Sequence, residues 1–225
     1  MNFHRIWDRF NETKTNSWYS DREKIQQAIA VMNDKLAGCI RLPIENTSYT
    51  GGKHVRIFRT WKKEEANACF AITGNNVPNT NQPLYQPFDY KNFQYVQLGW
   101  PCVKQKTIIH ELTHALGFFH EHTRPDRDVY IKPNMDVIEA TGRPNQWTKQ
   151  TQSLTFGVCY NPKGVMHYPA RKYNQWNKWN VESKMNDLKT EDIGGHDFTG
   201  MDILKLQRMY ECTEGKLYFK YGMNL

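Results

Sequence analysis

The feature that most restricts the fold of this chain is the run from Thr107 to Glu121, which reads TIIHELTHALGFFHE. His110 and His114 are four residues apart, and on a helix this spacing places both imidazole rings on one face. Glu111 comes one residue after the first histidine and reaches toward the open side of a metal held there, where a water would sit. We therefore predict a helix over residues 107–116 that presents two nitrogen ligands and a carboxylate together.

A glycine and a third histidine extend this pattern. Gly117 lies three residues after His114, and His120 lies three residues further on. Glycine takes the left-handed conformation at little cost, so it can end the helix and turn the chain back. His120 then returns as a third ligand from outside the helix. Three neutral histidines suit a tetrahedral zinc ion with one open position, so the expected cofactor is Zn²⁺.

A second motif lies some fifty residues downstream, where residues 164–168 read GVMHY. A buried methionine is usually only part of a core. Behind the extended histidine pattern, however, Met166 stands where the metzincin clan of metallopeptidases has its Met-turn. The two motifs together are much more specific than either one alone.

The rest of the chain predicts an α+β protein. Residues 20–23, SDRE, form a capping box, followed by apolar residues at helical spacing up to Gly38. Residues 55–57 and 95–98 alternate like strands, and the Asn- and Pro-rich run 75–90 is expected to be an exposed loop. Thr199 caps a last helix with Ile203, Leu206 and Tyr210 on one face.

We interpret the chain as a single catalytic domain over residues 1–225, built as two lobes with a zinc cleft between them. The order of helix, strands, histidine helix, irregular half and final helix favours this arrangement. The boundary is expected just after Gly117, with an N-terminal lobe over about 1–117 and a C-terminal lobe over about 118–225. No apolar run approaches the roughly 20 residues that cross a bilayer, so no membrane contact is expected.

The chain is basic, with a net charge of +7, which makes an acidic partner an alternative to consider. The Lys and Arg residues are scattered, and no nucleic-acid recognition motif accompanies them, so no nucleic-acid partner is expected. The five cysteines include no CxxC pair, which argues against a thiolate metal site and leaves the disulfide pairing open. With sequons at Asn11 and Asn46, the cysteines favour a secreted, extracellular protein.

On these motifs the chain resembles the astacin family of metalloendopeptidases within the metzincin clan. Glu121 after the third histidine, the run RPDRD over residues 124–128 and the Met-His-Tyr of the Met-turn carry the resemblance. Cys39-Ile-Arg and the ending Tyr210-Glu-Cys212 also match landmarks of the family. The family usually has serine where this chain has Gly164.

The resemblance implies a role for each matching residue. His110, His114 and His120 bind zinc, and Glu111 is the catalytic base and acid. Tyr168 is both an additional metal contact and a catalytic phenol. Met166 forms a hydrophobic floor beneath the metal, and Glu121 contacts the mature amino terminus.

The resemblance also implies disulfides and a substrate strand. Cys39 pairs with Cys212, and Cys69 with Cys102, which leaves Cys159 as the odd thiol or as the link of a disulfide dimer. Residues 69–71 form the strand along which an extended protein or peptide substrate lies. The insertion over residues 75–90 is expected to restrict access to it.

These observations predict a zinc-dependent endopeptidase that uses activated water. An alternative from another class is a catalytically inactive binding protein that keeps the metzincin fold. Glu111 argues against it, because only the reaction needs that carboxylate. A basic nucleic-acid-binding protein is the second alternative, disfavoured by the dispersed charge.

Overall fold

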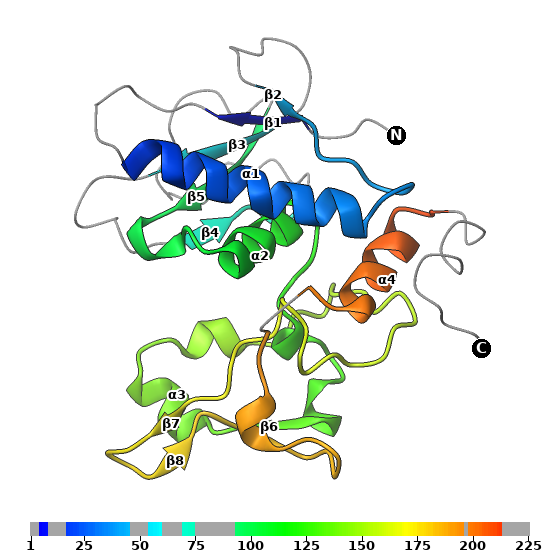
Figure 1. Ribbon diagram of the computed structural model, residues 1–225. Coiled ribbons are helices and arrows are strands. Elements are labelled where there is room, and N and C mark those ends of the chain that lie inside the picture. The colour runs from blue at the N-terminus through cyan, green and yellow to red at the C-terminus, as the bar shows by residue number, and fades with distance from the viewer. Residues whose placement is uncertain are drawn as a thin grey trace. The chain divides into compact units, whose positions relative to one another are not determined.

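The computed structural model describes residues 5–8, 17–45, 54–59, 69–74, 93–195 and 198–212. The chain forms two compact units, of which unit 1 comprises Met1–Gly117 with Leu206–Leu225 and unit 2 comprises Phe118–Lys205 (Figure 1). The mixture of helices and sheets confirms the predicted α+β class. No described helix has both the length and the apolar character that crossing a membrane requires.

A five-stranded sheet organises unit 1. Four strands pair in parallel, and the fifth, β4, pairs antiparallel with β5 at the end of the sheet. In spatial order the strands are β2 (Ile44–Glu45), β1 (Arg5–Asp8), β3 (His54–Arg59), β5 (Phe93–Leu98) and β4 (Cys69–Ala71). β3 and β5 confirm the two strands predicted from alternation.

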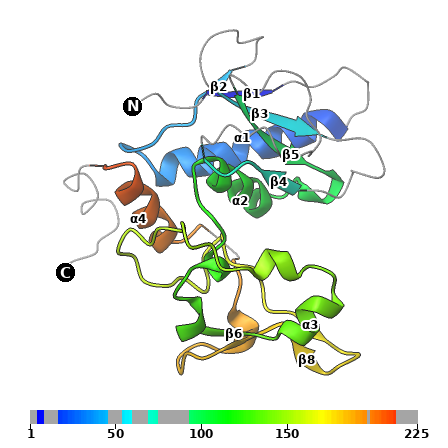
Figure 2. The ribbon, with the colours of Figure 1, turned by 180° about the vertical axis from the view of Figure 1, so that it is seen from behind.

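Two helices pack together in unit 1, namely α1 (Ser17–Lys35) and α2 (Gln105–Ala115). α1 lies in front of the strands in Figure 1 and behind them in Figure 2, so it covers one face of the sheet. The apolar spacing predicted for this segment is confirmed, because its five members are buried: Ile25, Ala28, Ile29 and Met32 within α1, and Leu36 directly after it.

The predicted start of α1 is wrong. The helix begins at Ser17, three residues before the predicted cap at Ser20, because residues 18 and 19 continue the helical turn upstream. The predicted loop over residues 75–90 lies outside the described residues. The second predicted helix is confirmed to within two residues at its start, since α2 begins at Gln105.

Both disulfides implied by the family resemblance are present, and both lie within unit 1. Cys69–Cys102 joins β4 to the short 3₁₀ helix Trp100–Cys102, with 5.7 Å between the Cα atoms. Cys39–Cys212 joins the segment after α1 to the segment after α4, with 5.3 Å between the Cα atoms. α4 spans Gly200–Met209 and is the last described helix.

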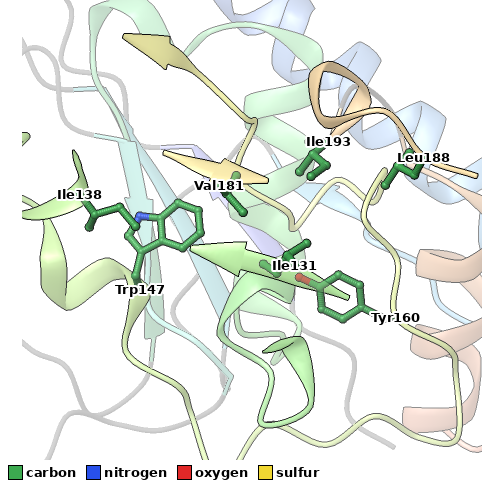
Figure 3. Close-up of a cluster of buried hydrophobic side chains, with 7 residues drawn as sticks. All are labelled: Ile131, Ile138, Trp147, Tyr160, Val181, Leu188 and Ile193. Carbon is green, nitrogen blue, oxygen red and sulfur yellow. The ribbon is translucent and has the colours of Figure 1, made fainter. Parts of the chain in front are cut away.

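Unit 2 is mostly irregular, as expected for the half that follows the histidine helix, with short elements around a compact core. β6 (Ile131–Pro133) pairs with β9 (Val181–Ser183), and β7 (Lys172–Tyr173) pairs with β8 (Lys178–Trp179). The short helix α3 (Met135–Ala140), of six residues, was not predicted. Figure 3 shows the core side chains of this unit: Ile131, Ile138, Trp147, Tyr160, Val181, Leu188 and Ile193.

Candidate metal centre

Helix α2 presents the first two predicted ligands. The apolar side chains of Ile108, Ile109 and Leu112 are buried and fix the rotation of the helix. His110 and His114 therefore share the remaining face, where their rings meet edge to face with centroids 4.8 Å apart. His114 is buried and His110 is half-buried.

Gly117 turns the chain after α2 as predicted. Its φ is +112°, a value that glycine adopts without the strain that a side chain would create. A Cβ at this position would also stand 2.5 Å from the Cε atom of Met209. Its N–H donates a hydrogen bond of 2.8 Å to the carbonyl oxygen of His114, which closes the end of the helix.

The ligand atoms of His110, His114 and His120 all lie within 4.8 Å of one another. A tetrahedral zinc with bonds of about 2.1 Å needs nitrogens about 3.4 Å apart, and this separation falls within that limit. Among the described residues these three histidines form the cluster able to hold a metal ion. The donor set therefore fits zinc, the cofactor predicted from the sequence.

Glu111 directly follows His110 on α2. Its side chain is 4% exposed, and its Oε2 atom is buried without a hydrogen-bond partner among the described residues. Burial raises the pKa of this carboxyl to about 8, because the charged form loses its hydration. A neighbouring cation opposes that shift by favouring the carboxylate. The orphaned oxygen is an acceptor suited to a water molecule beside the metal.

His122 supports the third histidine. It is fully buried, and its Nε2–H donates to the carbonyl oxygen of Gln146 at 3.0 Å while Nδ1 accepts from the Tyr168 N–H at 3.4 Å. Its ring stacks against His120, with centroids 5.0 Å apart. The sequence analysis did not single out His122, because nothing in a spacing of two residues from His120 distinguishes a supporting ring from a ligand.

The structure brings the ring of Tyr168 next to that of His120, with centroids 4.5 Å apart. The Tyr168 hydroxyl donates to the side-chain oxygen of Gln146 at 3.0 Å. Gln146 therefore contacts both His122 and Tyr168, and it was also missed because its role depends on a contact 22 residues away. The metal contact and the catalytic role expected of Tyr168 stay predictions.

The segment around Met166 is tied to the third histidine. The Glu121 N–H donates to the Met166 carbonyl oxygen at 2.9 Å, and the Met166 side chain is buried. His167 is buried as well, and its Nδ1–H donates to the Tyr168 carbonyl oxygen at 2.7 Å while Nε2 accepts from the Tyr160 hydroxyl at 2.7 Å. Burial lowers the pKa of His167 to about 4, so this ring is neutral and structural.

The Glu121 carboxylate accepts hydrogen bonds from three groups within unit 2. Its Oε1 accepts from Arg124 Nη1 at 2.9 Å and from the Asn161 N–H at 2.8 Å, and its Oε2 accepts from Lys205 Nζ at 2.5 Å. The contact expected between Glu121 and a mature amino terminus stays a prediction, because no amino terminus is among the described residues. Lys205 is 84 residues from Glu121, and no sequence pattern indicated the contact.

Gly164 stands where the resemblance leads one to expect serine, and the structure gives a steric reason for the glycine. A Cβ there would stand 2.5 Å from Asn161 Nδ2 and 2.7 Å from Asp202 Oδ1. Asp202 in turn accepts from the N–H groups of Val165 and Thr199 at 3.2 and 2.8 Å. The Thr199 hydroxyl accepts from the Asp202 N–H at 3.3 Å, which confirms the predicted cap of α4.

Cys159 is exposed and free, while the other four cysteines form the two intramolecular disulfides. The disulfide dimer considered through Cys159 is therefore not supported. Among the described residues this thiol has no disulfide partner.

Comparison with solved structures shows the same fold in a zinc-protease. High choriolytic enzyme 1, a hatching enzyme zinc-protease from Oryzias latipes, superimposes with a TM-score of 0.67 at 19% identity, covering 93% of this chain and 90% of that one. Myroilysin superimposes with a TM-score of 0.54 at 18% identity, covering 93% of this chain and 92% of that one. At these identities the likeness concerns the fold alone.

Comparison with curated proteins finds closer sequences. The zinc metalloproteinase nas-6 of Caenorhabditis elegans is 36% identical over 126 residues, which is 55% of this chain and 36% of that protein. The meprin A subunit beta of Rattus norvegicus is 30% identical over 167 residues, which is 69% of this chain and 21% of that protein. The chain thus spans well under half the length of these relatives.

The peptidase family described as Astacin matches residues 4–211, nearly the whole chain. That range contains all three clustered histidines, Glu111 and the Met166 segment, and the histidine cluster fits the zinc of this family. The chain therefore belongs to the astacin family of zinc metallopeptidases.

Proposed function

We propose that this chain is a zinc-dependent endopeptidase that cleaves internal bonds of protein or peptide substrates. His110, His114 and His120 are the proposed metal ligands. The observation that carries the proposal is the placement of the buried, unpartnered Glu111 oxygen on the helix that bears two of these histidines. A protein that only bound its partners would have no use for such a carboxylate, because burying it without a hydrogen bond is costly.

Zinc, when bound, supplies Lewis-acid chemistry that lowers the pKa of water and polarises a carbonyl group. Glu111 takes the proton from the attacking water as a general base. It then delivers that proton to the nitrogen of the leaving amine, so that no net charge accumulates on the enzyme. The Tyr168 hydroxyl donates a hydrogen bond to the oxyanion that forms during attack.

The substrate is proposed to lie extended along β4 (Cys69–Ala71). This strand ends the described sheet, and its neighbour on the inner side is β5. An extended peptide added to such an edge satisfies its own backbone groups. The Gly74 N–H donates to the His114 carbonyl oxygen at 3.0 Å, which links the chain after β4 to the histidine helix. Peptides N-methylated at alternate amides test this pairing, since one register of methyl groups should abolish cleavage.

We also propose that the protein works outside the cell. Two disulfides support this, because such bonds persist in oxidising compartments.

The decisive experiment incubates the purified chain with a peptide library and sequences the products. Cleavage within peptides that stops with a zinc chelator and returns with added zinc is the expected result. Glu111→Gln is the matched control, because it alters one atom of the side chain and leaves all three histidines. Zinc binding without any cleavage would favour the inactive binding protein instead.

A further inference from the structure

Lys205 is a lysine that the fold buries almost completely. Lys205 is only 5% exposed, and its Nζ donates a hydrogen bond to Glu121 Oε2 at 2.5 Å. The ammonium also lies 5.9 Å from the centre of the Phe118 ring, whose face attracts a cation. Lysine is almost never buried unless paired, so the contact with Glu121 is what retains this charge inside.

The other cation near Glu121 has its own counter-charge. Arg124 donates to both carboxylate oxygens of Asp126, at 2.9 and 2.7 Å, in a bidentate pair. It also donates to the carbonyl oxygens of Val158 and Cys159. Arg124 also pairs with Glu121 Oε1 at 2.9 Å, so one guanidinium is shared by two carboxylates, Glu121 and Asp126. Lys205 supplies the second positive charge that this group of carboxylates needs.

Glu121 holds two segments of the site together. It directly follows His120, and its N–H donates to the carbonyl oxygen of Met166 at 2.9 Å. Its Oε1 also receives the N–H of Asn161, at the start of the same segment. Fixing the Glu121 carboxylate therefore fixes the backbone that carries the third histidine.

We propose that Lys205 is a positioning residue for the metal centre: its ammonium neutralises Glu121 and thereby holds His120 ready to bind zinc. Both carboxylate oxygens of Glu121 accept hydrogen bonds from groups within residues 124–205. The inference rests on the proposed function, because it assumes that His120 is a zinc ligand.

The test compares Lys205→Met, which keeps the aliphatic stem and removes the charge, with Lys149→Met. Lys149 pairs with Asp128 at 2.8 Å on the surface and is the matched control. Zinc affinity is measured by competition with a chromogenic chelator, alongside the melting temperature of the metal-free protein. Lys205→Met should weaken zinc binding about 10- to 100-fold, the range for residues that orient metal ligands, and Lys149→Met should leave it unchanged.

A double variant separates charge from packing. Glutamine at position 121 needs no counter-charge, so Glu121→Gln/Lys205→Met should bind zinc as well as Glu121→Gln alone. If the two losses add instead, Lys205 acts through packing and the proposal is overturned. Where Lys205→Met does not fold, the double variant decides: zinc binding by it supports the proposal, and its failure to bind overturns the proposal.

Equal zinc affinities for Lys205→Met and wild type would overturn the proposal. A wild-type chain that binds no zinc at all would instead refute the proposed function, so the two failures are distinguishable.

Discussion

The imidazole ring of His122 stacks on the phenol ring of Tyr168, with centroids 4.2 Å apart and planes inclined by 29°. Both nitrogens of His122 are hydrogen-bonded to backbone groups, so this ring is a fixed surface. The stack keeps the phenol beside His120, whatever the partner of its hydroxyl. The position of the Tyr168 ring is thus set by its neighbours, while its hydroxyl donates to the Gln146 side chain.

Replacing Tyr168 by Phe should lower kcat by about one to three decades, the range for losing one oxyanion donor. The ring and its stack remain, so zinc content and melting temperature should be unchanged, and KM should move little. Steady-state kinetics on one defined peptide measure the effect. Cleavage at the wild-type rate would show that the hydroxyl has no catalytic role, and loss of zinc would show a structural one.

Replacing Glu111 by Gln should lower kcat by about two to four decades, while zinc still binds. Because the carboxylate is buried with an unpartnered oxygen, its removal should not lower the melting temperature of the metal-free protein. Metal analysis, calorimetry and peptide assays measure the three properties. Glu139→Gln, on an exposed side chain of α3, is the control and should behave as wild type.

Replacing His120 by Ala should reduce zinc affinity more than tenfold, because the cluster loses one of three ligands. Zinc per chain after dialysis against a weak chelator is the measurement. The Glu111→Gln protein serves as the reference, since it retains all three histidines. Equal zinc retention by the two variants would contradict the assignment of His120 as a ligand.

Replacing Gly164 by Ala should destabilise the fold by about 1–3 kcal/mol, the range for inserting a methyl group into a packed site. The methyl would overlap Asn161 and Asp202, which are tied to one another by a hydrogen bond of 3.2 Å. Gly142→Ala is an informative comparison, because its Cβ meets nothing within 4 Å and only its φ of +75° is strained. Urea unfolding of both variants should show the larger loss for Gly164.

Replacing Cys39 and Cys212 by Ser should cost about 2–5 kcal/mol of stability, the range for removing a native disulfide. The bond joins residues 173 apart, so it restricts a long loop in the unfolded chain. Cys159→Ser is the control and should leave the unfolding midpoint unchanged, because that thiol is free. A similar midpoint for all three proteins would contradict this account.

The histidine helix was predictable because its signals are local. The spacing of His110 and His114 is set by the helical period, and Gly117 marks the turn that follows. Strands β1 and β2 could not be predicted, since four and two residues are too few to show alternation. The contact between Lys205 and Glu121 was beyond reach for another reason: it joins positions 84 apart, and burial of a lysine leaves no periodic trace.

The bond between Cys39 and Cys212 also determines what happens when the chain is nicked. Every peptide bond from residue 39 to residue 212 lies inside the covalent ring that this bond closes, and so do all the clustered histidines. A single cut within the ring leaves the two fragments attached to one another. If the chain cleaves itself there, the two fragments stay joined until the disulfide is reduced, and the histidines stay on one covalent molecule.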